Sequence, residues 1–166
     1  DGESPLKEGI DLHVKECVFR WKYPIWYGNS HVVSECTFKA TARSGIWYTH
    51  QSAFSRCSFL APKYFRRCHD VEISDSFFPN AVETFWSCLN VRISRCEFKG
   101  DYLLKDSSGV ELSEVTLHGN YLLDGGSDIV IKNCYFESKD AFWNCEDVTV
   151  KDSFISGEYK IGRAHV

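Results

Sequence analysis

The segment Val91-Arg92-Ile93-Ser94-Arg95-Cys96-Glu97-Phe98 contains a pattern that recurs eight times along the chain, at steps of 19 to 21 residues. Two apolar residues at a spacing of two are followed by a small residue and then by another apolar one, usually Phe. β-Branched residues at this spacing are typical of strands, and a fixed period near 20 residues is typical of a solenoid. The copies are Leu12-Val14-Cys17-Phe19, His31-Val33-Cys36-Phe38, Ser52-Phe54-Cys57-Phe59, Val71-Ile73-Ser76-Phe78, Val91-Ile93-Cys96-Phe98, Val110-Leu112-Val115-Leu117, Ile129-Ile131-Cys134-Phe136 and Val148-Val150-Ser153-Ile155.

A second apolar column supports three strands in each repeat. It stands eight residues before the second apolar position and comprises Ile25, Ile46, Phe65, Phe85, Leu104, Leu123, Phe142 and Ile161. A leucine-rich repeat would need repeated Leu and a helical segment, and the chain has neither pattern. We therefore predict an all-β fold, a right-handed parallel β-helix of about eight rungs with three short strands per rung, stacked about 4.8 Å apart. It forms a single domain over residues 1–166.

Polar residues mark the bends between these strands. One bend carries Ser30, Gln51, Asp70, Asn90, Gly109, Asp128 and Asp147, which tolerate left-handed backbone or bond to it. In register they should form a polar ladder. A second bend falls around Gly100, Gly119 and Gly157, where a positive φ is expected.

The composition excludes several classes of partner. The formal charge is −4 with scattered basic residues, so the sequence shows no footprint for nucleic acid. No apolar stretch approaches the ~18 residues of a membrane span. No targeting signal is visible, although the chain opens at Asp1 without Met. We expect no cofactor.

The eight cysteines fall into two columns. The first column contains Cys17, Cys36, Cys57, Cys96 and Cys134, and its remaining repeats carry Ser76, Val115 and Ser153. The second contains Cys68, Cys88 and Cys145, and its other repeats carry Thr49, Ser107 and Gly126. Exchange with Ser and Val is typical of small buried positions. We therefore favour stacked reduced thiols over disulfides. No CxxC motif and no Cys/His pattern with the spacing of metal ligands occurs, which argues against a metal site. Reduced thiols favour a cytoplasmic location.

Several phrases carry a family resemblance, most specifically Lys139-Asp140-Ala141-Phe142-Trp143-Asn144-Cys145 and Glu83-Thr84-Phe85-Trp86-Ser87-Cys88. They resemble a bacterial family of unknown function with a pectin-lyase-like right-handed β-helix. The resemblance covers nearly the whole chain and implies a fold without an assigned catalytic residue. Members are usually longer, so it also implies a shortened version of a longer solenoid.

Alternation along the strand predicts an outward stripe next to the second apolar column. It reads Trp26, Trp47, Arg66, Trp86, Lys105, Asp124 and Trp143, with Arg43 and Lys63 beside it. Indole faces can stack on sugar rings, and Arg66 between Trp47 and Trp86 is spaced for cation–π contacts. We take Trp47, Arg66, Trp86, Lys105, Trp143, Arg43 and Lys63 as the candidate ligand-binding face. The catalytic candidates are Glu83, Asp101 and Asp140, since glycoside cleavage uses two carboxylates about 5 to 9.5 Å apart.

Three interpretations of this stripe remain. The first is a non-catalytic binding or self-associating scaffold, in which stacked Trp and Arg side chains cover the strands or meet another chain. The second is saccharide binding, and the third a polysaccharide-cleaving enzyme, both argued from fold analogy. A homodimer through a solenoid edge, an end or the Trp face is expected, because terminal rungs expose unpaired strand edges. His50 and His69 fall at the same bend and can stack.

Overall fold

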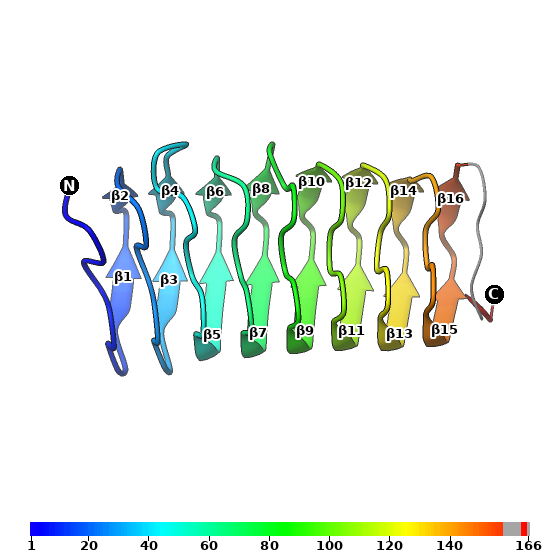
Figure 1. Ribbon diagram of the computed structural model, residues 1–166, viewed down its shortest axis with the longest axis horizontal. Coiled ribbons are helices and arrows are strands. Elements are labelled where there is room, and N and C mark those ends of the chain that lie inside the picture. Colours follow the sequence, from blue (N-terminus) through cyan, green and yellow to red (C-terminus); the bar gives the residue numbers. More distant parts are fainter. Residues whose placement is uncertain (158–163, 166) are drawn as a thin grey trace.

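The computed structural model describes residues 1–157, 164 and 165, and these form a β-solenoid of two parallel sheets (Figure 1). Odd-numbered strands form a nine-stranded sheet and even-numbered strands an eight-stranded one, so each turn contributes one strand to each sheet. The all-β solenoid of about eight turns is therefore confirmed. The strands are β1 (His13–Lys15), β2 (Val18–Phe19), β3 (Val32–Ser34), β4 (Thr37–Phe38), β5 (His50–Ser55), β6 (Ser58–Phe59), β7 (His69–Ser74), β8 (Phe77–Phe78), β9 (Leu89–Ser94), β10 (Glu97–Lys99), β11 (Ser108–Ser113), β12 (Thr116–His118), β13 (Ser127–Lys132), β14 (Tyr135–Glu137), β15 (Glu146–Lys151), β16 (Phe154–Ser156) and β17 (Ala164–His165).

The third segment of each turn differs from the expected strand. Within the described residues, isolated bridges in this segment join Trp26 to Trp47, Trp47 to Arg66 and Arg66 to Trp86, and the later turns have only tight turns there. Left-handed residues cause this difference. Ile46, Phe65 and Phe85 each have a φ between 57° and 59°, which breaks the extended backbone at the centre of the segment. We call this part of the surface the third side, residues 20–31, 39–49, 60–68, 79–88, 100–107, 119–126 and 138–145.

The predicted columns fill the core. Parallel in-register pairing places identical positions of successive turns on top of one another, so like side chains stack. The rings of Phe38, Phe59, Phe78 and Phe98 form one such stack, with centroid separations of 4.9, 4.4 and 4.4 Å. The members of the second apolar column from Ile25 to Phe142 are all buried. Its last member, Ile161, lies outside the described residues.

The bends explain how ordinary residues turn the chain. The predicted first bend is confirmed, since Ser30, Gln51, Asp70, Asn90, Gly109, Asp128 and Asp147 all have positive φ. Its ladder is partly bonded, because Asn90 Nδ2 donates to Asp70 Oδ1 at 3.1 Å. At the second bend Gly100 and Gly157 have positive φ and Gly119 does not.

A further corner, between the two sheets, was not expected. Its left-handed residues are Glu16, Glu35, Arg56, Asp75, Arg95, Glu114, Asn133 and Asp152. Charges pair along this corner, and Arg95 contacts Asp75 through two hydrogen bonds of 2.7 and 3.2 Å. The Arg95 guanidinium lowers the pKa of the Asp75 carboxyl. These exposed pairs contribute little energy each, and they offset repulsion between stacked charges.

Candidate functional site on the third side

The outward residues of the third side form one continuous stack. The rings of Trp26 and Trp47 are nearly parallel, 12° apart, with centroids separated by 5.1 Å. The Arg66 guanidinium follows, with its Cζ 5.1 Å from the Trp47 ring and 4.6 Å from the Trp86 ring. Lys105 Nζ lies 5.2 Å from the other side of Trp86. The predicted cation–π contacts of Arg66 are thus present.

The indoles of this stack are also anchored to the next turn. Trp26 Nε1 donates to the Ser44 carbonyl at 2.6 Å, and Trp47 Nε1 donates to the Lys63 carbonyl at 2.7 Å. Trp86 Nε1 makes the same bond to Tyr102 at 2.7 Å. These three indoles are half-buried. Neighbouring turns cover both faces of Trp47 and Trp86 and one face of Trp26, so a ligand could meet Trp47 and Trp86 only at their edges.

Trp143 is the exception in the column. It is 42% exposed, and within residues 1–157 no ring or cation stacks on it. The expectation of an exposed Trp column thus holds fully at this one position. Alternation predicted the outward direction of the other indoles, and stacking between turns hides their faces.

Two of the three carboxylates proposed for catalysis are already held by other groups of the protein. Glu83 Oε2 is held by Arg66 at 3.0 Å and by Lys63 at 3.4 Å. Asp101 Oδ1 accepts the backbone N–H of Asn120 at 2.8 Å. Glu83 and Asp140 occupy one column three turns apart, about 14 Å at the spacing of neighbouring strands. That separation exceeds what glycoside cleavage uses, and Glu83 already has two cationic partners.

Charge is divided along the third side. The three segments within residues 20–68 contain seven basic residues and no acidic one, namely Arg20, Lys22, Lys39, Arg43, Lys63, Arg66 and Arg67. The four segments within residues 79–145 contain five acidic and two basic residues, namely Glu83, Asp101, Asp106, Asp124 and Asp140 with Lys105 and Lys139. Asp1 and Glu3 face Arg20 and Lys22 at 3.9 and 3.8 Å, so the basic half is centred on Arg43 to Arg67.

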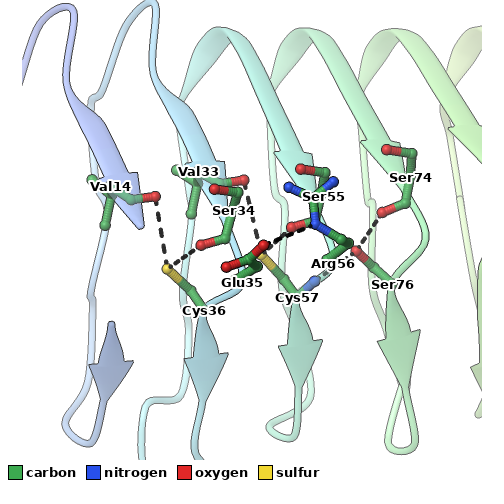
Figure 2. Close-up of polar contacts among 10 residues, drawn as sticks. All are labelled: Val14, Val33, Ser34, Glu35, Cys36, Ser55, Arg56, Cys57, Ser74 and Ser76. Atoms are coloured by element: carbon green, nitrogen blue, oxygen red, sulfur yellow. Dashed lines mark hydrogen bonds and ion pairs between the residues drawn. The ribbon is translucent and has the colours of Figure 1, made fainter. Parts of the chain in front are cut away.

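The cysteine columns point inward as expected, with one correction. Cys17 is exposed, because its turn is the first and has a neighbour on one side only, while the other seven cysteines are buried. All eight are free thiols. Figure 2 shows the arrangement around Cys36 and Cys57: each sulfur faces the carbonyl two residues before it, Ser34 at 3.2 Å and Ser55 at 3.3 Å.

The polar bonds of these columns explain why Cys exchanges with Ser and Thr. The Ser76 hydroxyl donates to Ser74 O at 2.8 Å and accepts the backbone N–H of Cys57, on the preceding turn, at 3.1 Å. Cys134 does the same with its sulfur, which accepts the N–H of Val115 at 3.4 Å. A small side chain that both donates and accepts a hydrogen bond satisfies the buried backbone C=O and N–H groups at this corner. These positions therefore require hydrogen-bonding capacity as well as small size.

Two histidines use ring nitrogens as acceptors between turns. His31 Nδ1 accepts the backbone N–H of Leu12 at 3.2 Å, and His50 Nδ1 accepts that of His69 at 3.1 Å. The rings of His50 and His69 stack at 3.6 Å, as the sequence suggested. Burial lowers the pKa of both His31 and His50, so the neutral form that accepts these bonds is favoured.

Within the described residues, no cluster of three His, Cys, Asp or Glu side chains has the arrangement of a metal site. The described part of the chain contains no helix that is long and apolar enough to cross a membrane.

A family model described as "Protein of unknown function (DUF3737)" matches residues 1–163. No curated protein matches. A pentapeptide repeat protein involved in heterocyst differentiation regulation, from the cyanobacterium Nostoc sp. strain PCC 7120, is 8% identical over 96% of this chain and 89% of its own, with a TM-score of 0.26. A plasmid-mediated fluoroquinolone resistance protein is 14% identical over 95% and 74%, with a TM-score of 0.25.

Proposed function

Because the chain belongs to the DUF3737 family of proteins of unknown function, its role has to be argued from its surface, and we propose a non-catalytic scaffold that self-associates along the third side. The observation that supports this proposal is the division of charge, with basic residues in the first three segments and mainly acidic residues in the last four. Glu83 is held by Arg66 and Lys63 and lies about 14 Å from Asp140, which favours binding over turnover by these two carboxylates.

A second copy of the chain fits this division. A two-fold axis perpendicular to the solenoid reverses one copy relative to the other and brings the same surface of both together. The basic half of each copy then faces the acidic half of its partner. Electrostatic complementarity of this kind selects the antiparallel arrangement, because a parallel one would place like charges opposite each other.

The middle of the third side supplies a matched pair of charges. Arg67 and Asp106 are both exposed and occupy one column, one turn before and one turn after Ser87. With the two-fold axis beside Ser87, Arg67 of each copy faces Asp106 of the other. The stacked indoles and Arg66 provide a stiff, half-buried floor between these charges. Rigid side chains lose little conformational entropy on association.

Reversing either charge should weaken the dimer, and mixing the two reversed variants should restore it. Each reversal alters two contacts in a two-fold dimer, and at about 1 kcal/mol per exposed pair the dissociation constant of Arg67→Glu or Asp106→Lys rises about 30-fold. In the mixed dimer one contact joins the two reversed side chains and the other retains Arg67 and Asp106, so both contacts are favourable. Sedimentation velocity on each variant, and on the mixture, measures these three outcomes.

Glu72→Lys is the matched control for net charge. Glu72 is exposed on β7, in the nine-stranded sheet, and its replacement changes the net charge as much as Asp106→Lys does. It should leave the dissociation constant near that of the wild type. Raising NaCl from about 0.1 M to about 1 M, which shortens the Debye length from about 10 to 3 Å, should weaken the wild-type dimer. A monomer at low salt, or variants that associate like the wild type, would contradict the proposal.

A saccharide ligand is the second candidate, and the exposed indole of Trp143 favours it. A free indole face can stack on a sugar ring. In a glycan array, Trp143→Ala should abolish binding to any glycan that the wild type retains. Trp21→Ala is the control, since Trp21 is also on the third side and is 47% exposed. Absence of glycan binding by the wild type, or equal binding by both variants, would rule out this site.

A further inference from the structure

Three cysteines stand on successive turns at the start of the solenoid. The pairing of Val18 with Thr37 and of Thr37 with Ser58 places Cys17, Cys36 and Cys57 at equivalent positions immediately before these strands. Thr37 N donates to Cys17 O at 2.9 Å, so the first two cysteines lie across one ladder bond. The strand spacing of about 4.8 Å falls within the 4.4 to 6.8 Å between Cα atoms of disulfide-bonded cysteines.

Access differs along this column. Cys17 is exposed and lines an open depression of about 630 Å³ together with Leu12, Val14 and Val18. Cys36 is only 1% exposed. A small oxidant in water therefore reaches Cys17 first.

The surroundings of Cys36 favour its thiolate. The equivalent positions on the two neighbouring turns place the Cys36 sulfur between the thiols of Cys17 and Cys57. The interaction with Cys57 is the largest of the causes that lower the pKa of Cys36 to about 6 in spite of its burial. The pKa of Cys57 is raised, chiefly by its interaction with Cys36 and then by burial, so Cys57 remains a thiol rather than a competing nucleophile.

We propose that Cys17 and Cys36 form a peroxide-sensitive pair that closes to an intramolecular disulfide. The Cys17 sulfur attacks hydrogen peroxide, the O–O bond breaks, and a sulfenic acid and one water form. The Cys36 sulfur then attacks the sulfur of Cys17, the S–O bond breaks, the S–S bond forms, and the oxygen leaves as a second water. The two thiols lose two electrons and two protons, and one peroxide is reduced to two waters.

The position of the pair explains why it would react before the other stacked thiols. β2 pairs with β4 alone, so the first turn can shift by the fraction of an ångström that disulfide geometry needs. Cys57 is held between two turns, and Cys68 and Cys88, also on neighbouring turns, are both buried. An interior column resists such movement because its packing is dense on both sides.

Tryptic mapping after treatment with one equivalent of hydrogen peroxide tests this directly. Cleavage after Lys15, Arg20, Lys22, Lys39, Arg56 and Lys63 places the three cysteines on separate peptides, residues 16–20, 23–39 and 57–63. The expected product links 16–20 to 23–39 within one chain, and the folded protein loses two of its eight free thiols. A linkage between two copies of 16–20, or unmodified peptides beside oxidised Cys57, would overturn the proposal.

Variants separate the role of Cys17, which forms the sulfenic acid, from that of Cys36, which attacks it to close the disulfide. In Cys36→Ser the sulfenic acid of Cys17 should persist, so dimedone labels peptide 16–20 several-fold more than in the wild type. In Cys17→Ser the remaining thiols should resist the same dose. Cys96→Ser is the matched control, because Cys96 lies in the same column between Ser76 and Val115, and its loss should leave the 16–20 to 23–39 linkage unchanged. Equal dimedone labelling in wild type and Cys36→Ser would show that Cys36 does not resolve the sulfenic acid.

Discussion

Phe59→Ala is expected to lower the free energy of unfolding by about 4 kcal/mol, the largest loss that a single truncation of the core should cause. Phe59 is fully buried in the middle of the Phe stack. Its ring contacts those of Phe38, Phe54, Tyr64, Phe65 and Phe78 at centroid distances of 4.9, 6.3, 5.3, 5.5 and 4.4 Å. Removal leaves a cavity that the neighbouring turns cannot fill, because their spacing is fixed by the ladder bonds on either side.

Thermal unfolding followed by circular dichroism measures this effect. At about 2 to 4 °C per kcal/mol for a chain of this size, the melting temperature should fall by about 8 to 16 °C. Phe77→Ala is the matched control. Phe77 lies on the next turn, where it pairs with Ser58, the residue before Phe59, and its side chain points outward and is 44% exposed. It should change stability by less than about 1 kcal/mol. If both variants melted alike, the inward stack would not be the source of stability.

Gly119→Ala is expected to lower the free energy of unfolding by about 3 kcal/mol. A Cβ built on Gly119 would stand 1.8 Å from the Gly100 carbonyl oxygen, on the preceding turn. Relief of this clash requires the two turns to separate, and the bond from Gly100 N to His118 O, now 3.0 Å, lies at the same place. The φ of Gly119 is not positive, so the cost arises from the contact and not from the backbone conformation.

Urea unfolding of Gly119→Ala and Gly2→Ala gives the comparison. Gly2 has no heavy atom within 4 Å of an added Cβ, so its replacement should be neutral or slightly stabilising. A Gly119→Ala midpoint equal to that of the wild type would mean that neighbouring turns are free to move apart at the second bend.

Much of the fold can be predicted from the sequence because each turn repeats the same demands on the same positions. The column from Leu12-Val14 to Val148-Val150 alternates at period two, and in the wall of a solenoid one face of each strand meets the core while the other faces outward. The third strand of each turn was not confirmed, for a local reason. Ile46, Phe65 and Phe85 are apolar and buried like strand residues, yet their φ is left-handed, a conformation that bulky side chains rarely adopt.

The outward orientation of the candidate site's side chains could be predicted from the sequence, but the extent of their exposure could not. Alternation correctly placed Trp47, Arg66 and Trp86 outward, and it carries no information on what lies one turn away. Residues at one column position in successive turns stack, so consecutive aromatic and cationic residues in a column were a sign that their faces are occupied. The charge division was also present in the sequence, and the total of −4 concealed it because acidic residues outside the third side outweigh the surplus of basic residues on it.

Each turn of this solenoid contacts only the turn before and the turn after it, as the ladder order from β1 to β15 shows (Figure 1). The interior is thus a row of similar interfaces, and its stability is close to a sum over neighbours. Folding can nucleate on any two adjacent turns and then propagate in both directions, with no distant contact required. Insertion or deletion of one complete period would therefore change the length of the molecule while leaving every other interface intact.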